Sequence, residues 1–289
     1  MDAKLATCSL ILLILLGSCT ANDSTENGEI STKPRAHDHN ARQDIRIEQV
    51  IHSHSSSHMH HMDPQLIVFF FLEDLKLDNT MPIYFPKRKL SDTSHHLLPK
   101  EESDSIPFSS DKLDYLLNLF SLPENSPQAL AMEDTLRQCE TKPIKGETKL
   151  CATSYESMLD YTKSILGSKT EIEILSTSPL TGSSSDLLQK YTINGIREIK
   201  ASKTVQCHTM PYPYAIFYCH YQTSQNKVYM VSLAGENGDN VEAVAVCHMD
   251  TSQWSRSHVA FQMLGVEPGS SSVCHFFPAD NFVLVPSTK

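Results

Sequence analysis

The spacing of hydrophobic residues changes from helical to strand-like about midway along the chain. An early run recurs at intervals of three and four and predicts a helix, through Leu113, Leu116, Leu117 and Phe120. A second helix is expected from Ser126-Pro127 towards Cys139, because serine is a good N-cap and proline suits the first turn. Thr153 and Glu156 predict the capping box of a third helix that ends at Gly167.

From about Glu171 onwards, short hydrophobic runs separated by turn residues predict strands. Two shorter runs precede the helices, over 67–72 and 81–86. The later runs predict strands at 171–177, 188–194, 203–208, 214–221, 227–234, 241–249, 258–264, 272–277 and 281–285. Helices followed by strands predict an α+β fold, with a helical first half packed on a β-rich second half.

The first 66 residues have a different pattern. Lys4, an apolar run from Leu5 to Leu16 and small residues up to Ala21 predict a secretory signal peptide over 1–21. Residues 22–66 are polar, contain no aromatic residue and predict a disordered, histidine-rich leader. The folded domain is expected over 67–287. The apolar run is shorter than the roughly 20 residues of a membrane span, so no membrane span is expected. Asn22 begins the one glycosylation sequon.

Charge and cysteine content narrow the possible functions. The net charge is −10 and the basic residues are scattered, which argues against nucleic-acid binding. Six cysteines remain after cleavage, and in the secretory pathway they predict three disulfides. Short loops favour Cys139–Cys151 and Cys207–Cys219, which leaves Cys247–Cys274. In the alternative pairing, Cys247 and Cys274 bridge to the 207–219 segment.

Four cysteines in the last third of the chain are each followed at once by histidine. The steps are separated by gaps of 10, 26 and 25 residues, and they are Cys207-His208, Cys219-His220, Cys247-His248 and Cys274-His275. Adjacent residues of a strand point to opposite faces, so disulfides on one face could brace imidazoles on the other. Imidazole ligands suit copper, zinc and nickel, and copper leads the affinity series. The array therefore predicts a Cu²⁺ site; zinc, or half-buried histidines without metal, are the alternatives.

These steps and their spacing resemble the signature of the plant BURP-domain family. The Phe-Phe run at 69–71, the strand at 81–86, Cys151-Ala152-Thr153-Ser154 and the ending Cys274-His275-Phe276-Phe277-Pro278 strengthen the likeness. It covers roughly residues 67 to 286. The resemblance implies a plant secretory protein of the apoplast or vacuole. It also implies that the four histidines are copper ligands and that the neighbouring cysteines form bracing disulfides.

Two functions follow from the resemblance, and the set of four histidines, which is more than a scaffold needs, favours the first. Some family members are copper-dependent peptide cyclases that crosslink tyrosine or tryptophan side chains of ribosomal peptides. Residues 22–66 contain neither tyrosine nor tryptophan, so a cyclase of this sequence is expected to act in trans on a separate precursor peptide. Other members are non-catalytic seed, stress-response or cell-wall proteins, for which a cell-wall polysaccharide is the expected partner.

A few further residues are candidates for supporting roles. His258 could orient a metal ligand, although an ordinary surface or core histidine is the simpler interpretation. The leader histidines His58, His60 and His61 could load copper, although a solvated linker is the simpler interpretation of that tract. Tyr212, Tyr214 and Tyr218 lie beside the first two steps and could meet the aromatic ring of a substrate, although packing of the hairpin is the simpler interpretation.

Overall fold

The computed structural model describes residues 68–85, 97–181 and 188–287. The expected signal peptide over 1–21 and the leader over 22–66 lie outside the described residues. Within the described ranges, no helix is long and apolar enough to cross a membrane.

Helices are concentrated between residues 100 and 166, as the hydrophobic spacing predicts. They are α2 (Lys100–Ser105), α3 (Leu113–Leu119), α4 (Pro127–Glu140) and α5 (Tyr155–Leu166), with short 3-10 turns η2 (Leu72–Asp74) and η4 (Ser110–Lys112). The cap of α4 is confirmed, since the Ser126 hydroxyl accepts a hydrogen bond from the Ala129 backbone N–H. The predicted capping box of α5 is wrong by one residue, because Ser154 with Ser157 forms it. Ser154 is fully buried, which favours its short side chain at this position.

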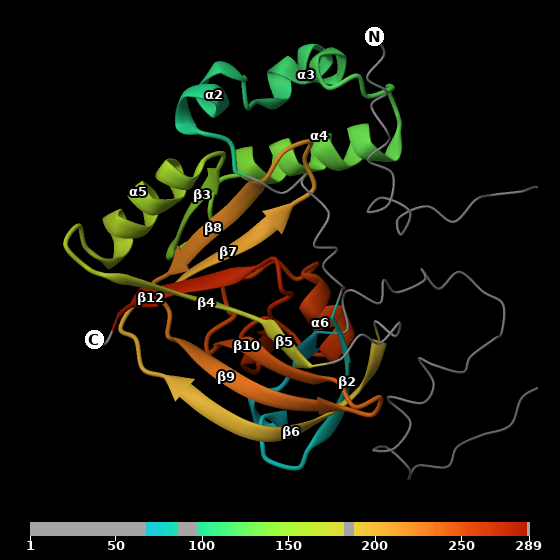
Figure 1. The fold of residues 1–289 in the computed structure, drawn as a ribbon, viewed down its shortest axis with the longest axis vertical. Coiled ribbons are helices and arrows are strands. Elements are labelled where there is room, and N and C mark those ends of the chain that lie inside the picture. The colour runs from blue at the N-terminus through green and yellow to red at the C-terminus, as the bar shows by residue number, and fades with distance from the viewer. Residues whose placement is uncertain (1–67, 86–96, 182–187, 288–289) are drawn as a thin grey trace, which may run out of the picture. The chain divides into compact units, whose positions relative to one another are not determined.

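Two antiparallel sheets form the body of the molecule (Figure 1). The larger sheet has the order β1 (Phe69–Phe70), β11 (Val273–Phe276), β10 (Asn240–His248), β9 (Asn226–Gly235), β6 (Leu188–Ile199) and β2 (Thr80–Tyr84), with β5 (Ser178–Thr181) also paired to β10. The smaller sheet has the order β3 (Glu147–Ala152), β8 (Ile216–Gln222), β7 (Val205–Met210), β12 (Phe282–Pro286) and β4 (Ile172–Ser176). The α+β class is confirmed, although the first half also contributes β1, β2 and β3.

One predicted strand is wrong: residues 258–264 contain a helix. In α6 (Val259–Leu264) the His258 side chain caps the first turn by accepting a hydrogen bond from the Ala260 N–H. Gly265 ends the helix in the left-handed conformation, with φ 64°. A short apolar run has no reliable period of its own, and the caps on both sides decide its structure.

The two sheets pack face to face through aliphatic side chains. Val228, Val244 and Val246 of the larger sheet share a buried cluster with Val283 and Val285 of β12. The opposite face of the smaller sheet is covered by α5, with which Leu284 shares another cluster. Neighbouring residues of β12 therefore point into different layers. This alternation sends sulfur and imidazole to different sides of the same strands.

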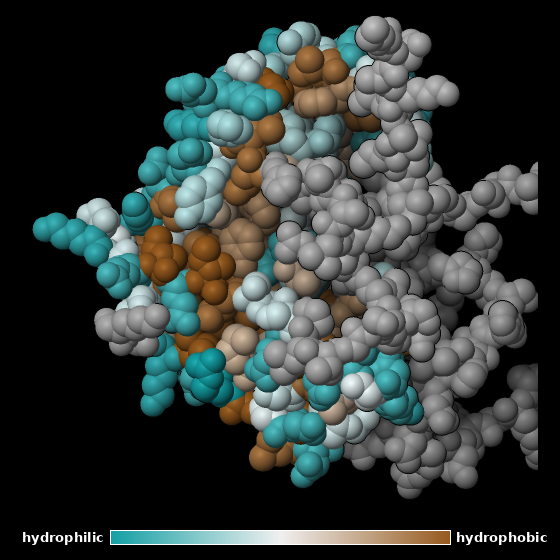
Figure 2. Space-filling model, in the orientation of Figure 1, coloured by the Kyte–Doolittle hydropathy of each residue, from teal (hydrophilic) through white to brown (hydrophobic). Residues whose placement is uncertain are grey.

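Hydrophobic side chains also reach the surface (Figure 2). In the face shown they gather where β4 crosses it and above α3. Ile174 of β4 is 49% exposed, and Tyr115 and Leu119 of α3 are 54% and 46% exposed. Some exposed hydrophobic side chains are ordinary on a protein surface.

Candidate metal centre

The hairpin of β7 and β8 holds the first two Cys-His steps. Cys207 lies directly opposite Cys219 in the strand register, and the two form a disulfide with a Cα–Cα distance of 4.0 Å. Both cysteines are fully buried in the cluster under α5. His208 and His220 are the next residues along each strand, so they point to the other face, towards the larger sheet.

Strands β10 and β11 repeat this arrangement in the larger sheet. Cys247 lies opposite Cys274, and their disulfide has a Cα–Cα distance of 3.9 Å. His248 and His275 follow them on the face turned towards the smaller sheet. The third disulfide, Cys139–Cys151, joins α4 to β3. All three disulfides confirm the local pairing, and the alternative pairing across the two sheets is wrong.

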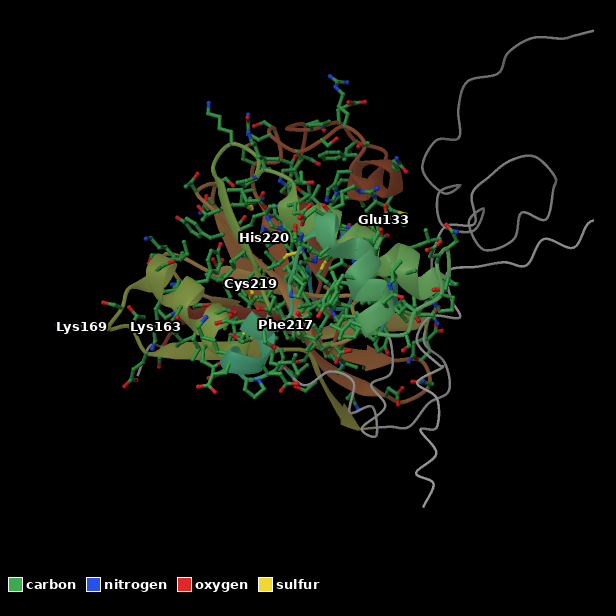
Figure 3. All side chains as sticks on the ribbon, turned by 90° about the horizontal axis from the view of Figure 1, so that it is seen from above. Glu133, Lys163, Lys169, Phe217, Cys219 and His220 are labelled. Carbon is green, nitrogen blue, oxygen red and sulfur yellow. A yellow bond between two sulfur atoms is a disulfide. The ribbon has the colours of Figure 1, made fainter. Side chains whose placement is uncertain are left out.

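The four histidines meet between the sheets as a closed ring of neighbours. The ring centroids are 5.5 Å apart for His208 and His220, and 6.4 Å for His220 and His248. The next two distances are 5.5 Å for His248 and His275, and 5.9 Å for His275 and His208. Figure 3 places Cys219 and His220 in the interior, whereas Lys163 projects at the edge. The four side chains are hereafter the histidine cluster.

His248 is oriented by two side-chain amides. Its Nδ1 lies 3.0 Å from Gln222 Oε1 and 3.0 Å from Asn226 Oδ1. Amide oxygens only accept hydrogen bonds, so Nδ1 carries the proton and Nε2 keeps its lone pair. Nε2 of His248 lies 3.4 Å from Nε2 of His275, and with its proton on Nδ1 it can only accept a hydrogen bond there. Metal-binding histidines are held in this way by a partner on their second nitrogen.

His220 is oriented by a carboxylate. Its Nδ1 lies 3.1 Å from Glu147 Oε1 of β3, and both side chains are almost buried. Burial acts to raise the pKa of Glu147, but the hydrogen bond and the attraction from His220 outweigh it, so the pKa is lowered. Glu147 is therefore an anion that accepts the Nδ1 proton, and Nε2 of His220 faces away from it.

His208 is held in the opposite sense by Asn281. The Thr209 N–H and hydroxyl donate hydrogen bonds to Asn281 Oδ1, at 2.9 Å and 2.7 Å. This fixes the amide so that its Nδ2 faces His208 Nδ1 at 3.3 Å. The amide N–H donates to Nδ1, so neutral His208 carries its proton on Nε2. Nδ1 of His220 and Nδ1 of His248 face hydrogen-bond acceptors, whereas Nδ1 of His208 faces a donor.

Burial keeps three rings of the cluster, those of His208, His248 and His275, uncharged. It lowers the pKa of His208 and of His248 well below the usual value, and the neighbouring histidines add to the effect. It lowers the pKa of His275 to about 4, with a smaller opposing contribution from a backbone hydrogen bond. These three imidazoles are therefore neutral at neutral pH, which is the state that binds metals.

Aromatic side chains enclose the cluster. The Trp254 ring stands edge-on to His248 with centroids 4.8 Å apart, and Phe277 stacks on His275 at 4.9 Å. His258 packs against Trp254 at 4.5 Å and reaches the cluster through that ring, while its Nδ1 caps α6. Tyr218 lies 5.6 Å from His220. The enclosure leaves His248 only 2% exposed.

The other two tyrosines of this region lie away from the cluster. Tyr212 packs against Phe108 and Phe120 beside the helices, and Tyr214 packs against Tyr212. The leader residues His58, His60, His61 and Asn22 lie outside the described residues.

The cluster is a set of imidazoles in contact and not a finished coordination shell. Among the described residues, no three His, Cys, Asp or Glu side chains already converge as a metal site requires. The rings are tilted or stacked, so their nitrogens have to turn towards a common point. Among these four rings, only the Nε2 atoms of His248 and His275 already lie close together, at 3.4 Å. This separation is near the value of about 3 Å expected for two nitrogens that are each about 2 Å from the same metal ion.

Several residues that hold the cluster were missed by the sequence analysis. Glu147, Gln222, Asn226 and Asn281 each contact one histidine. Asn226 lies opposite His248 in the strand register, and Gln222 is two residues after His220, on the same face. Only the strand register reveals these neighbours, and the sequence does not supply it.

Comparison with known proteins gives a consistent result. The BURP domain family model matches residues 68–286. The BURP domain-containing protein BNM2A of Brassica napus is 45% identical over 228 residues, which cover 77% of this chain and 80% of that protein. The BURP domain proteins USPL1 and RD22 of Arabidopsis thaliana are 43% and 39% identical, and each match covers 77% of this chain. The matches cover 81% of USPL1 and 56% of RD22.

Proposed function

The chain belongs to the BURP-domain family of plants, and from this membership we propose that its histidine cluster binds a copper ion. The observation that carries the proposal is the closed ring of four imidazoles between two sheets, each pair braced by its own cross-strand disulfide. A ligand set of this kind is held rigidly by the strands and not by loops. The disulfides and the family also indicate a protein of the secretory pathway, and we propose the apoplast or the vacuole as its destination.

The residues fit a copper ion through their donor chemistry. His220 and His248 each have Nδ1 hydrogen-bonded to an oxygen, which leaves Nε2 free as a ligand. His275 presents Nε2 beside that of His248. Neutral imidazoles favour copper or zinc over magnesium or calcium. His208 completes the set only after the Asn281 amide turns, because its Nε2 carries the proton.

We further propose that the protein is an oxidative peptide cyclase acting in trans. Bound copper supplies one-electron chemistry with dioxygen. The residues of this chain hold the ligands in place, exclude water from the cluster and position the peptide beside it. For each crosslink, two hydrogen atoms leave the peptide as one bond forms at a tyrosine or tryptophan side chain. Dioxygen accepts the two electrons and two protons.

Metal binding can be measured without any substrate. Trp254 is the single tryptophan of the chain and its ring touches His248. Copper at the cluster should therefore quench most of its fluorescence at a stoichiometry near one. His220→Ala should lower the copper affinity measured by this quenching at least tenfold. A matched variant outside the cluster, His258→Asn, should keep the wild-type affinity, because asparagine can still cap α6. Elemental analysis of the secreted protein and a free-thiol count complete the test. Copper-free protein without quenching would refute the proposal.

Cyclase activity needs a separate measurement. Copper-loaded protein is incubated in air with a library of tyrosine- and tryptophan-containing peptides, and products are identified by mass. A loss of two hydrogens that requires copper, and that disappears in His220→Ala, is the expected result. No such product from any peptide, with copper bound, would contradict the cyclase and leave the metal site intact.

A second candidate is a non-catalytic apoplastic or vacuolar protein of seeds, stress response or cell wall. The observation that favours it is the enclosure of the cluster, in which His220 is only 8% exposed and Trp254 covers His248. In that case the stacked histidines are a structural core. Specific retention on pectin, together with secreted protein that contains no metal, would support this candidate against the cyclase.

A further inference from the structure

One cleft of the described residues lies beside the cluster and is lined by lysines. It has a volume of about 600 Å³ and lies between two chain segments that cross from one sheet to the other, residues 198–204 and 221–227. Lys200, Lys203 and Lys227 line it, against one acidic residue, Glu198. This excess of positive charge is notable in a protein whose net charge is −10.

Two of these lysines are available to a ligand. The Lys203 ammonium donates to the Ile165 carbonyl at 2.9 Å and lies over the Tyr221 ring. For Lys200 and Lys227, the ion pairs found among the described residues include neither ammonium group. Unpaired ammonium groups in a concave surface attract carboxylates, because the surrounding walls concentrate their field.

A smaller cleft continues from the first towards the histidine cluster. It has a volume of about 320 Å³ and shares Gln222, Thr223 and Ser224 with the lysine-lined cleft. Trp254 forms part of its wall, and the same ring packs against His248. Gln222 also accepts the hydrogen bond from His248. Side chains that line the clefts therefore contact the cluster directly, since Gln222 and Asn226 of the first cleft and Trp254 of the second all touch His248.

We propose that the lysine-lined cleft binds an acidic segment of a peptide, whose adjacent aromatic residue then enters the smaller cleft beside Trp254. The inference rests on the proposed function for the identity of the substrate as a peptide. A peptide carries acidic and aromatic side chains on one chain. Its acidic residues therefore suit the lysine-lined cleft, and an aromatic residue next to them suits the adjoining smaller cleft. An acidic polysaccharide supplies carboxylates for the first cleft but has no aromatic group for the second.

The test uses metal-free protein, so that its outcome is independent of copper. Fluorescence anisotropy measures binding of a dye-labelled probe peptide with a run of aspartate and glutamate followed by tyrosine. Binding should weaken as salt rises, since the contacts are ionic and exposed. Lys200→Glu/Lys227→Glu should weaken it at least tenfold. Lys112→Glu/Lys163→Glu, with the same change of net charge on α5 and η4, should leave it within twofold.

Three outcomes would overturn the inference. Equal weakening in both double variants would show that only net charge matters. Equal binding of a probe with lysines in place of its acidic residues would show that the lysines of the cleft do not recognise acidic residues. Displacement of the probe by oligogalacturonate at lower concentrations than by unlabelled peptide would assign the cleft to a polysaccharide. None of these outcomes bears on copper binding, which the Trp254 fluorescence reports separately.

Discussion

The two halves of the histidine cluster are built alike but held differently. Each half is a pair of antiparallel strands with a cross-strand disulfide on one face and two imidazoles on the other. In the β10–β11 half, His248 donates to two neutral amide oxygens. In the β7–β8 half, His220 donates to a carboxylate and His208 accepts from an amide. The repeated motif fixes the positions of the rings, and neighbouring side chains decide where the proton lies on His208, His220 and His248.

This difference has a chemical consequence. The β10–β11 half already presents two Nε2 atoms side by side, 3.4 Å apart, and that of His248 keeps its lone pair. The β7–β8 half contains one ready nitrogen, on His220, and one that carries a proton, on His208. The two halves also hold each other, because Gln222 of the smaller sheet orients His248 of the larger one. We expect metal binding to begin at the β10–β11 half.

Acid should have the largest effect on the metal-free protein. The pKa values of His208, His248 and His275 are lowered by burial, so below the usual value of 6.5 the unfolded chain binds more protons than the folded one. The contribution of these rings to the free energy of unfolding is therefore constant above that pH and falls as pH drops from about 6.5 towards 4. Each ring contributes about 1.4 kcal/mol per pH unit, so the three together give a slope of about 4 kcal/mol per pH unit.

The pH dependence of stability should also differ between the two halves, because His248 and His275 belong to the β10–β11 half and only His208 belongs to the β7–β8 half. Urea unfolding across the pH range should show that His248→Ala/His275→Ala removes about two thirds of the cluster's pH slope. His208→Ala should remove about one third. An unchanged slope in the double variant would mean that the buried rings are charged in the folded protein, contrary to the comparison.

Removing the disulfides should have the next largest effect. Cys207 and Cys219 are 12 residues apart, and Cys247 and Cys274 are 27 residues apart. The chain-entropy model gives a stabilisation of about 3 kcal/mol for the first disulfide and somewhat more for the second, because its loop is longer. Replacing either pair by alanine should lower the free energy of unfolding by this amount and also weaken copper binding. Both quantities can be measured by urea unfolding and by Trp254 quenching.

The third disulfide is a matched control for this prediction. Cys139–Cys151 also joins cysteines 12 residues apart, but it links α4 to β3 and not the two strands of either histidine pair. Its removal should cost a similar free energy of unfolding and leave copper affinity unchanged. If copper affinity falls equally in all three variants, the disulfides act through global stability and do not brace the histidines.

Removing single ligands should distinguish the halves directly. His248→Ala should weaken copper binding on the order of 100-fold, because its Nε2 is already available and lies beside that of His275. His208→Ala should weaken it about tenfold or less, because this ring first has to lose its Nε2 proton. Isothermal titration with a competing chelator measures both. A greater loss for His208 would reverse the order of the two halves.

The architecture could be predicted from the sequence to a useful depth. The change from helical to strand spacing indicated the α+β class, and Ser126-Pro127 and Gly167 marked the helix ends, because these are local signals. Residues 258–264 were assigned to the wrong element because their period is ambiguous and a histidine cap is uncommon. The strand β3 was also missed, since its six residues are only partly hydrophobic.

In the candidate site, too, local features could be predicted from the sequence and long-range contacts could not. The alternation of a strand was enough to predict that cysteine and histidine of each step point to opposite faces, and the disulfide pairing followed from loop length. The partners of the rings could not be predicted. Glu147 and Asn281 lie 73 residues from the histidines that they contact, and only the packing of the two sheets brings them together.

Asn281 offers the smallest change that tests the comparison. In Asn281→Asp, one carboxylate oxygen can still accept from the Thr209 N–H and hydroxyl, while the other replaces the amide N–H that faces His208. His208 Nδ1 then becomes a donor, as in His220 and His248, and its Nε2 is freed as a ligand. Copper affinity should rise about tenfold.

The added negative charge could itself attract the metal, so a matched variant is needed to isolate the proton. Asn226→Asp places the same charge beside His248, whose Nδ1 is already a donor, and should raise affinity by threefold or less. Nitrogen-15 NMR of histidine-labelled, metal-free protein should show that His208 changes from the Nε2–H to the Nδ1–H form in the Asn281 variant alone. Equal gains in both variants, with the His208 signal unmoved, would mean that the two halves differ in charge and not in the position of a proton.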